Sequence, residues 1–422
     1  MRWLTPFRAC CGHVAQQISL GQYINGLLSD SARKSMQAML ARVTAPVRYQ
    51  AFQHFVTHAP WDAEEMWRIL RTQLPERAGV VIFDDTGFPK KGDHSVGVAR
   101  QYTGTLGKIA NCQVAVTATL WCGVRAWLLG AALYLPEDWA KDRIRRKKAR
   151  VPKSVVFQKK WELALGLLRD ALTAGLKITA VLADAGYGDV IAFRAALHTA
   201  KLPYAVGIAS TTSVFRGTPQ LNAPTRPAKA HARRRPRPTL AKGHKTMSVS
   251  ALAAGLPWRR VSWRNGTNAR RAACFAACRV TPAHDWQQTL APEVWLLCER
   301  SLDGSYDDKF FLIHLPSRTT LVRLVKLAHE RWAIEQQYQQ LKTELGLDHF
   351  EGRTYPGWNR HVALTAVAYA FLQRERMTRD PAITFETIRA IVQEIFTGLI
   401  FASHPRYLAW LADARTLLPL RL

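Results

Sequence analysis

The pattern of hydrophobic and polar positions divides the chain into regions that differ in predicted secondary structure. Residues 19–74 carry apolar side chains at helical spacing, interrupted by cap residues such as Ser29 and Ser31. Residues 79–83 then form a short apolar run that meets the sequence Asp84-Asp85-Thr86-Gly87. A run of this length before a Gly-containing turn predicts a buried strand that ends at the turn. The chain should therefore begin with helices and continue into a sheet.

The next region alternates strands and helices. Strand-like runs follow at 112–121, 126–135, 177–183 and 204–209, and helical patterns cover 154–174, with Ser154 as the cap, and 190–200. Three strands in succession, then helix, strand, helix and strand, is the order of an RNase H-like core. We therefore predict an α/β fold with an RNase H-like mixed sheet flanked by helices. In that order, the acids after the first and fourth strands would be neighbours.

The elements predicted after residue 209 indicate the domain boundaries. Residues 210–318 hold four strand-like pieces around a stretch rich in Pro, Arg and Lys, 226–245, which predicts a β-rich insertion with a basic loop. A helical pattern returns from 319 to about 345, and two more helices are expected near 358–372 and 385–396. The expected units are a helical N-terminal domain (1–74), the two parts of the core (75–209 and 319–376), the insertion (210–318) and a C-terminal helical segment (377–422).

The net charge of the chain indicates which class of molecule it binds. The chain has 59 Lys and Arg against 31 Asp and Glu, a formal net charge of +28. So strong a positive balance favours a polyanionic partner, with nucleic acid ahead of an anionic membrane surface. No apolar run reaches the length needed to span a bilayer, and the N-terminus lacks a signal-peptide pattern. We therefore expect a cytoplasmic protein that associates with the nucleoid when bound to DNA.

Three acids lie where strand-like runs meet turns. Asp84 and Asp85 follow the first strand, and Asp184 follows the fourth. A solvated turn residue is the ordinary reading of any one of them. Two similar strand ends in neighbouring positions instead indicate a shared site, because two-metal cleavage of phosphodiesters needs several carboxylates that converge. Facing direction alternates along a strand, so only one of Asp84 and Asp85 can point at such a site.

A third acid should come from a helix packed against the sheet. Arg331, Glu335, Tyr338 and Lys342 are spaced four, three and four residues apart and would share one helix face. Glu335 could then bind metal while Arg331 and Lys342 hold phosphate, although a solvated, ion-paired face would show the same spacing. The large apolar neighbours Trp332 and Ile334 indicate that the helix is packed. Rivals for the third acid are Glu330, Glu344, Asp348 and Glu351.

These motifs resemble a known family. The pattern Arg331-x3-Glu335-x6-Lys342 is similar to the Y-x2-R-x3-E-x6-K signature of the IS4-like superfamily of DDE transposases. The blocks at 84–92, 97–102, 111–114, 182–188 and 345–353 look like its IS701 branch, and the resemblance runs from about Tyr23 to Ala402. The signature Tyr, a DNA-gripping residue in the family, falls on Ala328. RNase H-like folds usually place the first ligand two residues before a Ser or Thr, which favours Asp84 with Thr86.

The resemblance implies an activity and partners. It implies Asp84, Asp184 and Glu335 as catalytic, metal-binding residues, with Asp85 as the rival for the first position. It implies two Mg²⁺ ions, with Mn²⁺ as a substitute, and hydrolysis at transposon ends followed by strand transfer to target DNA. Family members pair two inverted-repeat ends as oligomers, so we expect a homodimer on double-stranded DNA. The expected DNA contacts are Arg331, Lys342, Tyr338, Lys90, Lys91 and Arg100, with residues 1–74 reading the inverted repeat and Arg33 and Lys34 exposed.

Two other interpretations compete with an active transposase. A transposase-derived protein that binds DNA without cutting it would share the fold and the charge. An intact set of Asp84, Asp184 and Glu335 argues against it. A junction-resolving nuclease of the same fold would usually be shorter and lack a long insertion before the last acid.

Overall fold

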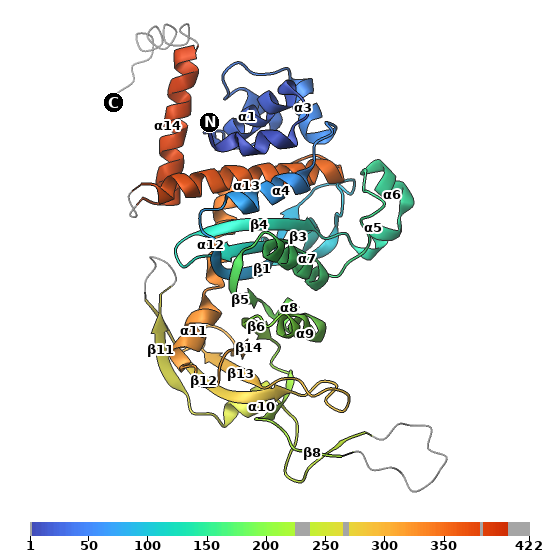
Figure 1. Ribbon diagram of the computed structural model, residues 1–422, viewed down its shortest axis with the longest axis vertical. Helices are drawn as coiled ribbons and strands as arrows, with labels where there is room; N and C mark the ends of the chain where they lie inside the picture. The colour runs from blue at the N-terminus through green and yellow to red at the C-terminus, as the bar shows by residue number, and fades with distance from the viewer. Residues whose placement is uncertain (1, 224–236, 265–269, 380–382, 404–422) are drawn as a thin grey trace.

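The computed structural model describes residues 2–223, 237–264, 270–379 and 383–403. Figure 1 shows an elongated molecule with helices at one end, a sheet through the middle and further strands at the other end. The greater part of the predicted basic loop, residues 224–236, lies outside the described residues. No helix within the described ranges combines the length and apolar character needed to cross a membrane.

The N-terminal region is helical, as predicted. Two 3₁₀ turns, Arg2–Leu4 and Pro6–Cys10, precede α1 (Val14–Leu28), α2 (Met36–Leu40), α3 (Tyr49–Thr57) and α4 (Ala63–Gln73). These helices lie against the long helix α13 (Tyr355–Met377), and α14 (Phe385–Ser403) stands beside them (Figure 1). The buried Tyr23 hydroxyl and His361 Nδ1 form a 2.9 Å hydrogen bond that joins α1 to α13. The N-terminal helices and α13 are thus packed into one helical body.

The central sheet begins with a meander and continues with parallel strands. Its first strands are β1 (Ala78–Pro89), β2 (Ala99–Thr103), β3 (Lys108–Trp121) and β4 (Ala126–Leu133). After α5 (Glu137–Lys141), α6 (Arg143–Lys148) and α7 (Lys160–Thr173), strand β5 (Lys177–Ala183) pairs in parallel with β1. Helices α8 (Ala185–Gly188) and α9 (Ile191–Thr199) lead to β6 (Tyr204–Ile208), which pairs in parallel with β5. This large mixed sheet with flanking helices is compatible with the predicted RNase H-like fold.

Most strands of residues 210–318 extend the same sheet, whereas β8 and β9 form a separate two-stranded sheet. The order across the 12-stranded sheet is β10-β7-β12-β13-β14-β6-β5-β1-β3-β2, with β4 on β3 and β11 on β12. The added elements are β7 (Ser213–Arg216), β8 (Leu221–Asn222), β9 (Thr239–Leu240), β10 (Met247–Ser248), α10 (Val249–Ala254), β11 (Arg259–Trp263), β12 (Arg271–Pro282), β13 (Val294–Arg300) and β14 (Lys309–His314). Because β14 pairs with β6, this region is joined edge to edge with the sheet that carries Asp84 and Asp184.

Several predictions from the sequence are wrong. Strand β1 does not end at Asp84 but runs on to Pro89, because β3 continues to pair with it through Cys112. Helix α7 begins at Lys160, so Ser154 is not its cap.

The basic residues before α2, Arg33 and Lys34, are not both exposed. Lys34 is 3% exposed, and its ammonium donates to the Ser29 carbonyl at 2.6 Å.

The helix expected from 319 to 345 is interrupted. Helix α11 (Leu321–His329) ends before Arg331, which stands at the N-cap of α12 (Trp332–Gln339), and a π-helical turn (Gln340–Glu344) follows. The predicted packing of this segment is confirmed, since Ile334 is fully buried in a cluster with Ile82 of β1 and Leu182 of β5. Helix breaks and π turns often occur at functional sites.

Candidate functional site

The alternation of β1 separates the two candidate first acids. Val80 and Ile82 pack in the cluster shared with α11 and α12, whereas Val81 and Phe83 pack in the larger core on the other side of the sheet. Asp84 continues the first series and Asp85 the second, because side chains alternate along a strand. The contacts agree: Asp84 pairs with Arg331, and Asp85 pairs with Lys160 of α7. Asp84 therefore points towards the helix that carries Glu335, and Asp85 points away.

Asp184 lies beside Asp84, as the strand order predicted. The direct pairing of β1 with β5 runs from Ala78 opposite Lys177 to Ile82 opposite Leu182, so both acids come two residues after the last pair. The Oδ1 atom of Asp184 is buried without a hydrogen-bond partner. Burial raises the pKa of Asp184, and the nearby Arg331 guanidinium opposes that shift. A cation or a hydrogen-bond donor would stabilise such a buried carboxylate oxygen.

Arg331 connects the strand acids to the helix acid. Its Nη1 lies 2.9 Å from Asp84 Oδ2, and its Nη2 lies 3.2 Å from Glu335 Oε1. Burial raises the pKa of Asp84 to about 6, with Arg331 lowering it and the charge of Asp184 raising it further. The Asp84 side chain is only 16% exposed, whereas that of Glu335 is 55% exposed. Arg331 thus lies near all three acids, with its guanidinium between the carboxylates of Asp84 and Glu335 and close enough to Asp184 to affect its pKa.

Two of the rival helix-side acids are ion-paired elsewhere, since Glu344 pairs with Arg389 at 2.5 Å and Glu351 pairs with Arg33. Asp348 lies 3.9 Å from His349, too far for a hydrogen bond, and its Oδ1 is buried without a hydrogen-bond partner. Glu330 caps the end of α11 and has a raised pKa because it is buried. Of these acids and Glu335, only Glu335 is linked to Asp84 by a common partner.

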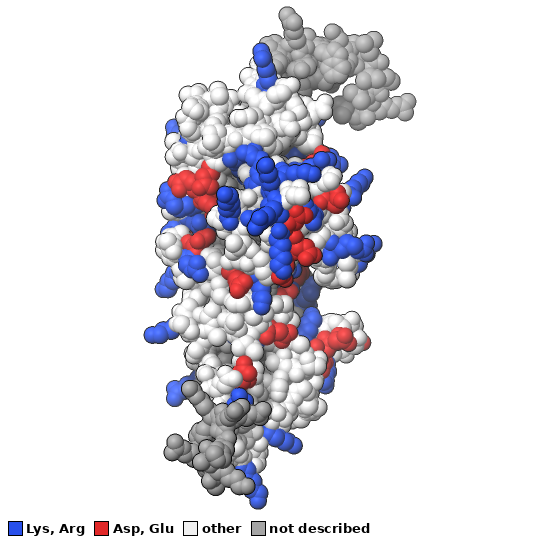
Figure 2. Space-filling model, turned by 90° about the vertical axis from the view of Figure 1, so that its right-hand side faces the viewer, with Lys and Arg blue, Asp and Glu red and all other residues white. Residues whose placement is uncertain are grey.

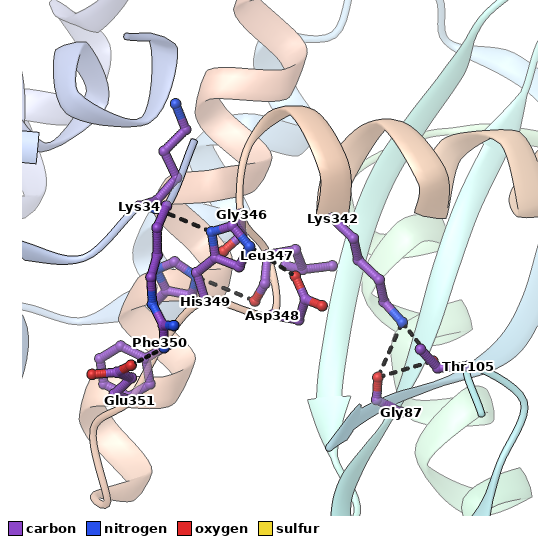
Figure 3. Close-up of polar contacts among 12 residues, drawn as sticks. Lys34, Gly87, Thr105, Lys342, Gly346, Leu347, Asp348, His349, Phe350 and Glu351 are labelled. Carbon is purple, nitrogen blue, oxygen red and sulfur yellow. Dashed lines mark hydrogen bonds and ion pairs between the residues drawn. The ribbon is translucent and has the colours of Figure 1, made fainter. Parts of the chain in front are cut away.

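Tyr338 and Lys342 lie farther along the same face. The Tyr338 hydroxyl is 2.6 Å from Thr117 Oγ1 on β3, directly across from Asp84 in the strand register. Lys342 Nζ donates to the Gly87 carbonyl at 3.0 Å and to Thr105 Oγ1 at 2.8 Å, and Figure 3 shows its side chain pointing at the end of β1. Burial lowers the pKa of Lys342. Arg331, Tyr338 and Lys342 therefore contact the stretch of β1 from Asp84 to Gly87 or the strand residue opposite it.

The expected basic contacts differ in exposure. Lys91 and Arg100 are exposed, but Lys90 is half-buried and donates to the Phe350 carbonyl at 2.6 Å. The loop that carries Phe350 also lies beside Lys34, whose backbone N–H donates to His349 Nδ1 at 3.1 Å (Figure 3). Lys90 thus holds the end of β1 to the loop that contacts the N-terminal helices.

A cleft of about 760 Å³ opens beside the acids. Asp184, Arg331 and Glu335 line one side, and residues from β11, β13 and β14 line the other. Within it, Glu299 is 2% exposed, lies 3.3 Å from His329 Nε2 and accepts a 2.7 Å hydrogen bond from Tyr306. Trp263 stacks on His329 with ring centroids 4.0 Å apart, so packing is the role that the structure gives this Trp.

Sequence reasoning missed this second cluster and the partners of Asp85. The available signal was an acid directly after five apolar residues, as Glu299 is in the strand Val294–Arg300. The partners of Asp85 are Lys160 Nζ, at 2.6 Å from Oδ2, and the hydroxyl of Tyr187, which donates to Oδ1. Tyr187 stands three residues after Asp184, within the block 182–188 that resembles the IS701 branch.

Comparison with known proteins agrees with the geometry. The family model described as DDE superfamily endonuclease matches residues 6–270, more than half of the chain, including Asp84 and Asp184 but not Glu335. The probable transposase for insertion sequence element IS701 from Microchaete diplosiphon is 35% identical over 172 residues, 39% of this chain. That match covers 41% of the relative's own length. With the family model spanning β1 and β5, the chain belongs to the DDE superfamily endonucleases, and within them it is similar to the transposase of IS701.

Proposed function

We propose that this chain is a DNA transposase that binds the terminal inverted repeats of its element, cleaves phosphodiester bonds at the ends and joins them to target DNA. The observation that carries the proposal is the convergence of Asp84 and Asp184 after paired parallel strands, with Glu335 reached through Arg331. The family match and the similarity to the IS701 transposase support the reaction class.

The acids suit divalent cations. Among the described residues, no group of three or more His, Cys, Asp or Glu side chains is already gathered as a metal site. The residues nonetheless fit such ions, because Asp184 Oδ1 is buried without a partner and burial raises the pKa of both strand acids. We propose Asp84, Asp184 and Glu335 as the ligands of Mg²⁺ ions, with Mn²⁺ as a substitute. Such ions supply a nucleophile of lowered pKa and stabilise the charge of the leaving oxygen.

The other residues of the proposed site would act on the DNA. Arg331, freed from its carboxylate partners, is placed to neutralise the phosphate that is cut, and the bidentate geometry of a guanidinium suits a phosphate. Tyr338 and Lys342 support the end of β1 and border the same path. Lys91 and Arg100 contribute exposed charge, and Lys90 sets the position of the neighbouring loop. Charge contacts of this kind give affinity without sequence choice.

The charge of the surface supports a DNA partner. Figure 2 shows Lys and Arg side chains gathered over the upper half of one face, around a group of acidic side chains, with fewer on the lower half. We propose that DNA lies on a basic surface of this kind, and that two copies of the chain hold two element ends as a homodimer.

The experiment that tests the proposal is cleavage and joining of a labelled duplex that carries the element's ends, in the presence of Mg²⁺. We expect wild type to release the ends and to join them to a target plasmid, and Asp184→Asn to bind the duplex but do neither. Cleavage without joining would support a nuclease of the same fold instead. Binding without cleavage by wild type would support a DNA-binding protein derived from a transposase.

A further inference from the structure

Beyond the last paired residues of β1 and β5, something other than the strand ladder must fix the distance between Asp84 and Asp184. The ladder ends at Ile82 opposite Leu182. The two acids follow on separate segments, since β1 beyond Ile82 continues its pairing with β3 while the chain after Ala183 enters α8. Metal ligands held on unlinked segments would spread, and ligand geometry must be held closely for tight binding.

A side-chain link crosses this gap. The Tyr187 hydroxyl donates to Asp85 Oδ1, and so joins α8 to the residue of β1 next to Asp84. Tyr187 is 2% exposed, and its ring packs on Phe193, which in turn meets Phe83 of β1 edge-on with ring centroids 6.3 Å apart. The hydroxyl therefore cannot turn away to solvent without disturbing the core.

The turn that begins with Asp184 is short and closely packed. The Asp184 carbonyl accepts hydrogen bonds from the N–H groups of Tyr187, at 3.3 Å, and Gly188, at 2.8 Å. On the far side, a Cβ on Gly188 would lie 1.8 Å from the Gly207 carbonyl oxygen, so α8 is pressed against β6. A change in the position of Tyr187 is thus passed to Asp184 through one rigid turn.

Asp85 is held in place by a second partner. Lys160 Nζ of α7 lies 2.6 Å from Asp85 Oδ2, so each carboxylate oxygen has its own donor. A carboxylate with both oxygens engaged on the side of the sheet away from Arg331 is not available to the proposed metal site.

We propose that Asp85 and Tyr187 are positioning residues: their hydrogen bond fixes the spacing between the carboxylates of Asp84 and Asp184. The inference rests on the proposed function, and assigns to Asp85 a role as support and not as a ligand. Substituting such a supporting partner typically weakens metal affinity by about 10-fold to 100-fold.

The test is direct Mn²⁺ titration of the full-length protein without DNA, by calorimetry. Tyr187→Phe removes only the hydroxyl and should weaken Mn²⁺ binding by about tenfold. Asp85→Asn keeps an oxygen that can accept from Tyr187, so it should retain more affinity than Tyr187→Phe. Tyr204→Phe is the matched control, because it removes a hydroxyl from another buried Tyr, on β6, and should bind Mn²⁺ as wild type does.

The outcomes separate this inference from the proposed function. Wild-type affinity in Tyr187→Phe, combined with loss of binding in Asp84→Asn, would refute the positioning role alone. Loss of binding in Asp85→Asn as complete as in Asp84→Asn would also refute it, because Asp85 would then be a ligand. Unchanged binding in Asp84→Asn would refute the proposed acid site, and the positioning role with it. Melting temperatures of the variants in EDTA, compared with Tyr204→Phe, identify any affinity loss caused by unfolding.

Discussion

The charge of Asp84 should destabilise the fold when no cation compensates it. Burial and the neighbouring Asp184 raise the pKa of Asp84 from its ordinary 3.8 to about 6, despite the ion pair with Arg331. The folded state therefore holds the proton more tightly than the unfolded chain, and stability falls as pH rises from about 4 to about 6. At 1.36 kcal/mol per pH unit, the full cost of ionised Asp84 is roughly 3 kcal/mol.

Asp84→Asn replaces this carboxylate with a neutral side chain of the same shape. In EDTA, the variant should be more stable than wild type by about 3 kcal/mol at pH 8 but by only about half as much at pH 5. The comparison within one pH cancels the effects of other titrating groups that the two proteins share. The assay is urea unfolding of both proteins followed by Trp fluorescence at pH 5, 6, 7 and 8.

The control is Asp307→Asn, which removes an exposed carboxylate from the loop between β13 and β14 and should shift stability little at any pH. Added Mn²⁺ should stabilise wild type and not Asp84→Asn. If Asp84→Asn is less stable than wild type at pH 8 in EDTA, the ion pair with Arg331 outweighs desolvation, and the reasoning is refuted.

Three further predictions concern the surroundings of the acids. Arg331→Gln should bind Mn²⁺ about tenfold more tightly at pH 8 without DNA, because it removes a repulsion of about 1.4 kcal/mol between the guanidinium and the cation. The same variant should cut DNA more slowly. Weaker Mn²⁺ binding in calorimetry would contradict this reasoning. Lys91→Ala and Arg100→Ala should each reduce the slope of log affinity against log salt by about 1, and an unchanged slope would mean that the residue does not contact phosphate. Gly188→Ala should cost about 2 kcal/mol in urea unfolding because its Cβ would meet the Gly207 carbonyl, whereas Gly166→Ala in α7, with open space around it, should be neutral or stabilising.

The sequence predicts best the elements in which hydrophobic residues recur with a clear helical or strand period. The predicted strand 177–183 has the observed bounds, Lys177–Ala183, because a seven-residue strand pattern lies between Gly175 and Gly186; five of its seven residues are buried. The proximity of Asp84 and Asp184 followed from the order of the strands. Strand alternation alone does not decide between Asp84 and Asp85, and the resemblance favours Asp84. The packing of Val80 and Ile82 against α11 and α12 agrees with Asp84.

What the sequence could not predict depends on contacts between distant segments. The end of β1 was placed too early, because pairing with β3 and not local turn propensity extends it to Pro89. Lys34 was expected on an exposed face, but its burial depends on the packing of α1, α14 and the loop after Lys342, which no local pattern reveals. The role of Asp85 was hidden for the same reason: its partners come from α7 and α8, 75 and 102 residues away.

The most direct test of the proposed site is a cleavage assay on a labelled duplex with the element's own ends and Mg²⁺, comparing wild type, Glu335→Gln and Glu330→Gln. Glu330 lies five residues earlier in the same segment and provides the matched control. We predict that all three bind the duplex, that wild type and Glu330→Gln cut at the ends, and that Glu335→Gln does not. Cutting by Glu335→Gln at the wild-type rate would contradict the assignment of the third acid and the site built on it.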